Sequence, residues 1–311
     1  MIYYPCDFKV VAVVARSLES AQKFATTHNI PKAYGSYDEL ANDSNVEVVY
    51  IGTINPGHLP IAKLMLNAGK HLLVEKPLTL NLKGTNELLN LATEKKLFVM
   101  EAIWSRFLPS YQFLKQQLAE KTIGDIVHVD VNFGIPIADV DRVAQKALGG
   151  STVLDIGVYC INAILVALNG EEPAELKATG HLNSEGVDES VSAALKFKNG
   201  VTAVLSTHAK AQLPCTATIT GTKGRIVLPE PFWCTDTVNV NGKDHTFPYP
   251  PTVVDCNYTN SSGLRYQAVE VRRCLLEGLT ESPQLSHADS RLIASLEDNL
   301  RAQVGCRFDV D

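Results

Sequence analysis

The sequence predicts an α/β protein in which an incomplete parallel sheet is followed by an α+β domain with a largely antiparallel open sheet. Before Glu101, apolar Val-rich runs alternate with helical patterns, as they do in βαβ units. After Glu101, several strand-like runs follow one another with few helices between them, which favours an antiparallel sheet. Because 311 residues exceed what one hydrophobic core usually holds, we expect two domains, over residues 1–101 and 102–311.

Strands and helices alternate in the first hundred residues. Residues 9–15 (KVVAVVA) are continuous and Val-rich rather than alternating, which predicts a strand buried on both faces. Ser17 can cap the helix that follows, and Gly69 can end a later one. The elements expected in this part are strands at 9–15, 46–52, 71–74 and 97–100 and helices at 18–28, 59–68 and 82–95.

The second part opens with a helix over residues 109–121 and an alternating strand over 126–133. A further helix is expected to begin at Asp155 and to end near residue 168. Residues 236–259 are rich in Pro, Asn and Thr, which indicates loops and short edge strands. The other expected elements are strands at 176–180, 191–196, 201–207, 216–220 and 225–228 and closing helices at 264–277 and 287–304.

The composition argues against several classes of partner. A formal net charge of −6 and a pI near 5.8 disfavour nucleic acid and anionic membranes. No apolar run reaches the roughly 18 residues of a membrane span, and the first residues show no signal-peptide pattern, so we expect a cytosolic protein. The seven cysteines are scattered without ligand spacing, so we expect free thiols and no metal site.

The tripeptide Glu75-Lys76-Pro77 directly follows the strand expected at 71–74. In an open α/β sheet, ligands bind at the carboxyl ends of the strands. Proline fixes the chain as it leaves the strand, and an ammonium at this place can hydrogen-bond a hydroxyl and stabilise a developing alkoxide. The alternative is a solvated surface lysine before a turn.

A second candidate motif is GGSTVLDIGVY over residues 149–159. Asp155 and Tyr159 are four residues apart, so they share one face if a helix begins there. A tyrosine, whose ordinary pKa is about 10, acts as a base near neutrality only if a neighbouring group helps, and a nearby charge can tune its proton affinity. The alternative is that Asp155 caps the helix and Tyr159 is a core aromatic.

The two motifs, in this order, resemble the glucose–fructose oxidoreductase-like (Gfo/Idh/MocA) family. Tyrosine at 159 and the segment MEAIWSRF over residues 100–107 resemble its dihydrodiol dehydrogenase branch, and the similarity extends to TGTKG at 220–224. The resemblance implies a dinucleotide-binding domain before a substrate-binding and dimerisation domain, and a homodimer. It also implies that Lys76 and Tyr159 are the catalytic pair, with Tyr159 as general acid/base, and that Asp155 orients the site.

The same resemblance implies two sets of binding residues. Flat apolar side chains would form a wall around a ring-shaped substrate, although each is also a plausible core residue: Trp104, Phe133, Trp233 and Tyr258. Other residues match positions near the cofactor, although His58 alone reads more simply as a helix cap: Thr53, Asn55, Pro56, His58, Glu75, Lys76 and Arg106.

Arg16-Ser17 follows the strand expected at 9–15. In a dinucleotide-binding fold, an acidic residue at this place takes the ribose 2′-hydroxyl, whereas arginine accommodates a 2′-phosphate. No acidic residue follows before Glu19, so the sequence indicates NADP rather than NAD. The alternative is that Arg16 is a surface charge beside a helix.

The glycine-rich turn of a Rossmann-type sheet is missing. That turn normally follows the first strand and opens a helix, roughly twenty residues before the position of Arg16. Here fifteen residues precede Arg16, and the first glycine is Gly35. We expect an N-terminal truncation, with Met1–Phe8 as substitute sequence and unpaired edges on the strands at 9–15 and 46–52. Cofactor binding would then be weak, unless the protein has abandoned it altogether.

Taken together, the resemblance implies an NADP-dependent oxidoreductase that oxidises trans-dihydrodiols of aromatic compounds to catechols. Aldopyranoses such as D-xylose, oxidised to lactones, are a second substrate class that it implies. Two alternatives stay open: another sugar dehydrogenase of the same family, and a non-catalytic sensor or interaction protein that has lost cofactor binding.

Overall fold

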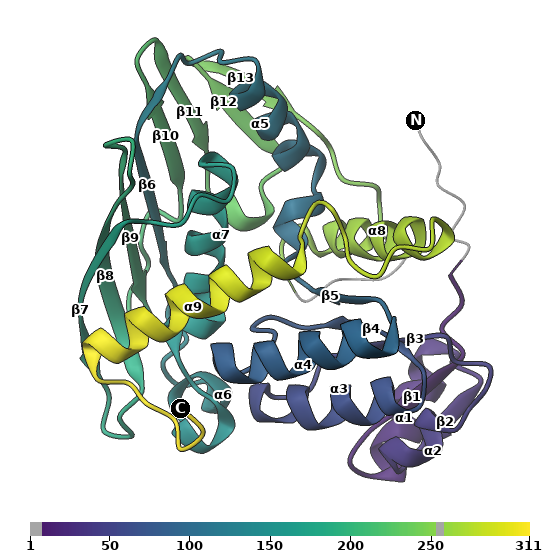
Figure 1. Ribbon diagram of the computed structural model, residues 1–311. Coiled ribbons are helices and arrows are strands. Elements are labelled where there is room, and N and C mark those ends of the chain that lie inside the picture. The colour runs from purple at the N-terminus through teal and green to yellow at the C-terminus, as the bar shows by residue number, and fades with distance from the viewer. Residues whose placement is uncertain (1–7, 253–257) are drawn as a thin grey trace.

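The computed structural model describes residues 8–252 and 258–311 of the chain, so the expectation for Met1–Phe8 lies outside the described residues except at Phe8. The predicted mixed α/β fold is confirmed, with a parallel part followed by a mainly antiparallel eight-stranded sheet (Figure 1). The N-terminal part contains β1 (Ala12–Val14), α1 (Leu18–His28), β2 (Lys32–Tyr34), α2 (Tyr37–Ala41), β3 (Val48–Ile51), α3 (His58–Asn67), β4 (His71–Val74), α4 (Leu82–Lys95) and β5 (Val99–Glu101).

Local capping explains where the helices of this part begin. The Ser17 side chain accepts a hydrogen bond from the backbone N–H of Ser20, and Asn81 accepts one from Gly84. Both satisfy backbone donors that a helix leaves free in its first turn. The sequence pattern missed β2 and α2, because elements of three and five residues are too short to show a period.

The parallel strands fall into two separate sheets. One pairs β1 with β2, and the other has the order β3–β4–β5. Among the described residues no strand lies between β1 and β3, which is the place where the sequence predicts that a strand is missing. The facing edges of β1 and β3 are therefore without a ladder partner in the part of the chain that the structure describes.

The second part is built on an eight-stranded sheet of order β13–β12–β11–β10–β6–β9–β8–β7, in which only the pair β6–β9 is parallel. Its strands are β6 (Ile126–Gly134), β7 (Glu175–Leu182), β8 (Asp188–Lys196), β9 (Thr202–His208), β10 (Ala217–Gly221), β11 (Gly224–Leu228), β12 (Thr237–Val240) and β13 (Lys243–Thr246). Its helices are α5 (Pro109–Ala119), α6 (Asp141–Ala144), α7 (Val158–Ala167), α8 (Arg265–Leu276) and α9 (His287–Val304).

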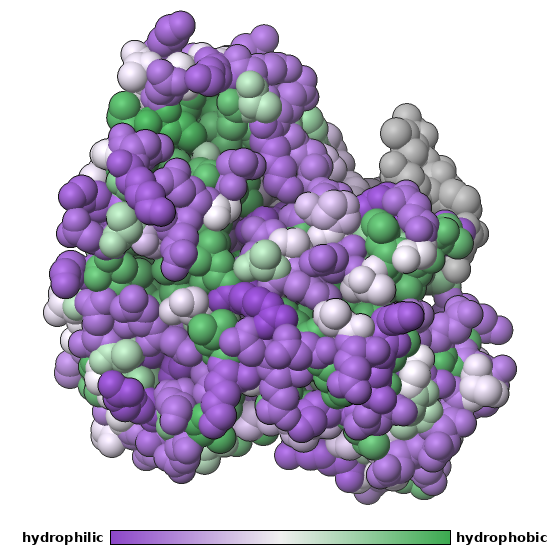
Figure 2. Space-filling view, viewed as in Figure 1, coloured by the Kyte–Doolittle hydropathy of each residue, from purple (hydrophilic) through white to green (hydrophobic). Residues whose placement is uncertain are grey.

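Three helices lie on one side of this sheet: α5, α7 and α9 (Figure 1). Every residue of α7 is buried. The stretch Lys146–Ala167 is, contrary to expectation, long and apolar enough to cross a membrane by composition, but all of its apolar window is buried inside the protein, as in a core helix. The visible surface is mainly hydrophilic, with scattered hydrophobic residues between the sheet and α9 (Figure 2).

Helix α9 connects the two parts of the molecule. It packs against α4 on one side and against β7 and β8 on the other. The Ser290 hydroxyl donates to the buried Glu101 carboxylate at 2.7 Å, and Asp298 accepts from the Leu82 backbone N–H at 2.9 Å. These contacts hold the end of β5 and the start of α4 against α9.

Candidate active site

Lys76 leaves β4 toward the second part of the molecule. Its ammonium donates to the backbone carbonyl of Asp155 at 2.6 Å and to the Asp155 carboxylate at 2.9 Å. The Lys76 side chain is only 15% exposed, so the pair is largely shielded from bulk water. The two motifs, 79 residues apart in sequence, thus meet in one place, and the interpretation of Lys76 as a solvated surface lysine is wrong.

Asp155 lies in a π-helical turn, Val153–Gly157, that opens the α7 helix. Ser151 caps this turn, so Asp155 is not the capping residue. The Asp155 carboxylate also accepts from Arg142 at 2.7 Å. Burial alone would raise the pKa of Asp155, but the Lys76 and Arg142 cations hold it below its usual value. Asp155 is therefore a carboxylate clamped between two cations.

Tyr159 faces this ion pair from the first turn of α7. It is 7% exposed, its hydroxyl accepts a hydrogen bond from Trp104 Nε1 at 2.9 Å, and Lys76 Nζ lies 5.5 Å from its ring centroid. The expectation that neighbouring groups ease its deprotonation is not met, because burial and then the negative charge of Glu75 raise the pKa of the phenol well above its usual value. Its surroundings therefore favour the neutral phenol of Tyr159 over the phenolate.

Three of the four predicted aromatic residues gather around Tyr159. Phe133 stacks on Trp233 with ring centroids 3.8 Å apart, and it lies 6.1 Å from the Tyr159 ring. Trp104 joins the group through its hydrogen bond to Tyr159. Tyr258 does not join it: this side chain is 74% exposed and makes no ring contact with the others among the described residues. The wall therefore consists of Trp104, Phe133 and Trp233.

The loop after β3 holds the two parts together. The Asn55 amide donates to the carbonyl of Gly149 at 2.9 Å. Gly149 has φ +75°, and a Cβ there would lie 2.9 Å from both Asn55 and Pro56, so only glycine fits. Thr53 is partly exposed at the start of this loop and makes only a weak hydroxyl contact, with the next carbonyl.

His58 was expected near the cofactor, and the structure corrects this. Its side chain is fully buried, with Nδ1 2.8 Å from the Pro77 carbonyl and Nε2 3.0 Å from the Thr53 carbonyl. Burial lowers its pKa despite these carbonyls. His58 is therefore a structural bridge between the loops after β3 and β4.

Arg106 was also expected near the cofactor, and the structure corrects this expectation too. It is 5% exposed, its Nε donates to Asn162 at 2.5 Å, and its Nη1 lies 3.3 Å from both the Asp289 carboxylate and the Gln284 carbonyl. These internal partners hold it on the side of α7 away from Lys76. The sequence signal failed because Arg106 is only two residues from Trp104 yet points to a different surface of the 3₁₀ turn Trp104–Phe107.

Arg16 lies at the carboxyl end of β1. It is exposed and makes no ion pair among the described residues, so its guanidinium is available to an anion. Ser17 is occupied as the cap of α1. Glu75 is also occupied, because its carboxylate accepts from the Tyr50 hydroxyl at 2.6 Å.

Arg142 and Tyr50 are the residues that the sequence pattern missed. Arg142 lies in the short helix α6 and its side chain is half exposed, so no motif or period marks it. A basic residue shortly before the GG motif was the available signal, because a buried carboxylate such as Asp155 needs a cationic partner. Among residues 8–252 and 258–311, no group of three His, Cys, Asp or Glu could hold a metal ion.

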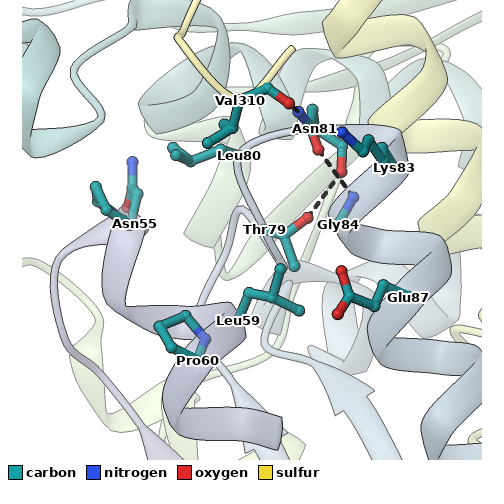
Figure 3. A pocket seen from close by; sticks show the side chains of 11 residues that line it. Asn55, Leu59, Pro60, Thr79, Leu80, Asn81, Lys83, Gly84, Glu87 and Val310 are labelled. Atoms are coloured by element: carbon teal, nitrogen blue, oxygen red, sulfur yellow. Dashed lines mark hydrogen bonds between the residues drawn. The ribbon is translucent and has the colours of Figure 1, made fainter.

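A separate pocket of about 300 Å³ lies beside this site, between α3, the start of α4 and Val310 (Figure 3). Asn55 and Pro56 reach it, whereas Lys76, Asp155 and Tyr159 do not. Asn81 closes one side by accepting from Gly84 and donating to the Val310 carbonyl. The pocket therefore does not belong to the catalytic group.

The parallel strands, the lysine at a strand's carboxyl end and the tyrosine opposite it define a Rossmann-type oxidoreductase. Residues 3–103 match the model of the oxidoreductase family with an NAD-binding Rossmann fold, and residues 111–227 match the GFO/IDH/MocA C-terminal domain. The chain belongs to the GFO/IDH/MocA oxidoreductase family, which confirms the resemblance seen in its motifs.

Two curated relatives with high coverage share a name. The trans-1,2-dihydrobenzene-1,2-diol dehydrogenase of Danio rerio is 45% identical over 303 residues, covering 97% of this chain and 91% of the relative. The Homo sapiens protein of that name is 39% identical over 305 residues, covering 98% and 91%. Among solved structures, a 3-ketoreductase from Actinomadura kijaniata in complex with NADP and TDP-benzene is 25% identical, with TM-score 0.80 and coverage of 95% and 90%.

A levoglucosan dehydrogenase in complex with NADH and levoglucosan shares the fold, with TM-score 0.81 at 21% identity, covering 94% of this chain and 87% of that one. The two solved structures bind different nicotinamide cofactors. For this chain, the match to the family with an NAD-binding Rossmann fold supports a nicotinamide cofactor without separating NADP from NAD.

Proposed function

We propose that this protein oxidises a trans-dihydrodiol of an aromatic compound to the catechol, with NADP as hydride acceptor. The observation that carries the proposal is the Lys76 ammonium, held 2.9 Å from Asp155 and 5.5 Å from the Tyr159 ring centroid beside buried aromatic side chains. An ammonium and a phenol can handle a hydroxyl group, and flat apolar faces suit a ring. The name shared by the relatives supports the diol.

Lys76 would donate a hydrogen bond to the substrate oxygen and stabilise the alkoxide that develops as the C–H bond breaks. Asp155 orients the ammonium, and Arg142 balances the charge of Asp155. In the oxidation the hydroxyl proton would pass to the Oη of deprotonated Tyr159, the phenolate, and in the reduction the neutral phenol would return it. Because the pKa of Tyr159 is raised, the phenolate is scarce near neutral pH and oxidation should accelerate at alkaline pH.

The residues present fit a nicotinamide dinucleotide at both of its ends. Arg16 offers a free guanidinium for the 2′-phosphate at the end of β1, and Lys76 lies where the nicotinamide would meet the substrate. When bound, the nicotinamide accepts the hydride. The described residues contain no glycine turn before β1, so they offer no helix N-terminus for the pyrophosphate there.

The choice of cofactor is tested by replacing Arg16 with aspartate. Arg16→Asp should shift the preference from NADP toward NAD by at least about tenfold, because a carboxylate repels the 2′-phosphate that the guanidinium attracts. The measurement is the ratio of kcat/KM for the two cofactors. Lys23→Asp makes the same change of charge on α1 and should leave the ratio as it is. An unchanged ratio in Arg16→Asp would exclude recognition of the phosphate by Arg16.

The substrate is tested by turnover with a panel of trans-dihydrodiols and aldopyranoses, including D-xylose, with product identified by mass. The trans-dihydrodiols should give the highest kcat/KM, because the aromatic group of Trp104, Phe133 and Trp233 makes the surroundings of Tyr159 apolar, which favours a ring with few hydroxyls. If only the sugars were turned over, the proposed substrate would be a sugar and not a dihydrodiol. No turnover, with no NADPH binding, would favour a sensor instead.

We also propose that the protein acts in the cytosol as a homodimer. The face of the eight-stranded sheet opposite α5, α7 and α9 is the surface for pairing, because strands such as β8 alternate buried and exposed residues along their length. A broad sheet face that no described helix covers can bury enough area against a second copy.

A further inference from the structure

A second pocket, of about 380 Å³, opens on the far side of α7 from Lys76. The 3₁₀ turn Trp104–Phe107 and α5 form one wall, and the end of α7 and the start of α9 form the other. None of Lys76, Asp155 and Tyr159 lines it. The pocket is therefore separate from the proposed catalytic site, although both adjoin the same 3₁₀ turn.

Arg106 lines this pocket and carries a donor that is not in use. Its Nε and Nη1 are bonded to Asn162, Gln284 and Asp289, but Nη2 is buried and has no hydrogen-bond partner among the described residues. The side chain is 6% exposed. A buried guanidinium N–H without an acceptor is costly, so an acceptor that enters the pocket gains the full strength of a charge-assisted hydrogen bond.

Lys115 of α5 is a second cation in the lining, and its nearest acceptor is the Arg106 carbonyl, at 3.5 Å. Burial and then the positive charge of Arg106 lower the pKa of Lys115 to about 8, against the opposing effects of Asp289 and Glu270. Asp289 is the one carboxylate in the lining, and it already accepts from Arg106 and from Ser286. The lining thus carries two positive charges and one negative charge.

We propose that this pocket binds a small dianionic oxyanion, either free or as the phosphoryl end of a phosphate ester. Its oxygens would accept from Arg106 Nη2 and from Lys115 Nζ, and its charge would offset the excess positive charge of the lining. The volume exceeds that of one tetrahedral anion, so the pocket also has room for the carbon part of an ester.

The test is calorimetric titration with sodium sulfate at constant ionic strength, because sulfate keeps its charge across the pH range used. The unaltered protein should bind sulfate saturably, and Lys115→Gln should bind it at least about tenfold more weakly. Lys121→Gln, which removes a lysine that is 73% exposed just beyond the end of α5, is the matched control and should behave like the unaltered protein. Thermal melts would show that each variant is folded.

The affinity for sulfate should also fall as the pH rises above about 8, since Lys115 then loses its charge. Sulfate held by Arg16 would bind equally well to Lys115→Gln, so an unchanged isotherm in that variant overturns the proposal, as does an absence of saturable binding. Inorganic phosphate and glycerol 3-phosphate are then titrated in the same way, and saturable binding of either one supports the site. Tighter binding of inorganic phosphate would indicate a free anion as the ligand, and tighter binding of glycerol 3-phosphate would indicate a phosphate ester.

Discussion

Replacing Lys76 by methionine should lower kcat for hydride transfer by about 10²-fold or more. The ammonium is a charged donor placed to stabilise developing alkoxide, and removal of such a donor usually costs two to three powers of ten, roughly 3–4 kcal/mol. The affinity for NADPH should change far less, because Arg16, the proposed partner of the 2′-phosphate, is unaltered. Steady-state rates and NADPH fluorescence titration measure the two effects separately.

The fold should survive this change. Asp155 keeps its 2.7 Å hydrogen bond to Arg142, so removing Lys76 does not leave a buried charge without a partner. Lys83→Met, at an exposed position in the first turn of α4, is the matched control and should retain full activity. Near-native turnover by Lys76→Met would remove this lysine from the mechanism.

Tyr159→Phe should abolish most turnover while leaving the protein folded. The variant keeps the ring and loses only the hydroxyl, so proton exchange with the substrate fails and kcat should fall by about 10² to 10⁴-fold. The cost in stability is about 1 kcal/mol or slightly more, because Trp104 Nε1 loses its acceptor. Oxidation rates and thermal melts of both proteins give the comparison.

Tyr111→Phe is the matched control, since Tyr111 is equally buried and its hydroxyl makes one hydrogen bond, to the Phe232 carbonyl, away from Lys76. It should lose stability to a similar extent and keep its activity. In the unaltered protein the oxidation rate should rise with pH, because the raised pKa of Tyr159 makes the phenolate more abundant only at alkaline pH. If Tyr159→Phe kept its activity within a few-fold of the native value, Tyr159 would be a core residue with no role in proton transfer.

Local signals made much of the fold predictable. The helices at 82–95 and 287–304 are confirmed to the residue, because Asn81 and the Ser286–Asp289 capping box mark where they begin. The helix expected from Asp155 begins earlier, as its first turn is π-helical and is capped by Ser151. Asp188 of β8 accepts hydrogen bonds from the Thr152 hydroxyl and the Val153 backbone N–H at this turn, and no local pattern encodes such contacts.

The sequence predicted the site residues whose position follows from the order of strands and helices. It did not predict those whose role depends on which partners surround them once they are buried. Lys76 and Asp155 meet because one ends a parallel strand and the other opens the helix that faces it. His58 and Arg106 were misassigned because their carbonyl and carboxylate partners come from distant segments, including Gln284, which lies 178 residues beyond Arg106. A motif match gives a residue's place in the chain but not the side to which its side chain points.

The division of the parallel strands into two sheets has a consequence for cooperativity. The unit of β1, α1 and β2 shares no backbone ladder with β3. It joins the rest of the molecule through side-chain packing, with Val14 and Tyr34 against the core that contains Ile51 and with α2 against α3. Its opening therefore breaks side-chain packing but no sheet hydrogen bond to β3, so it requires less free energy than global unfolding. Arg16 belongs to this independently opening unit, whereas Lys76 belongs to the cooperative body formed by β3, β4, β5 and α9.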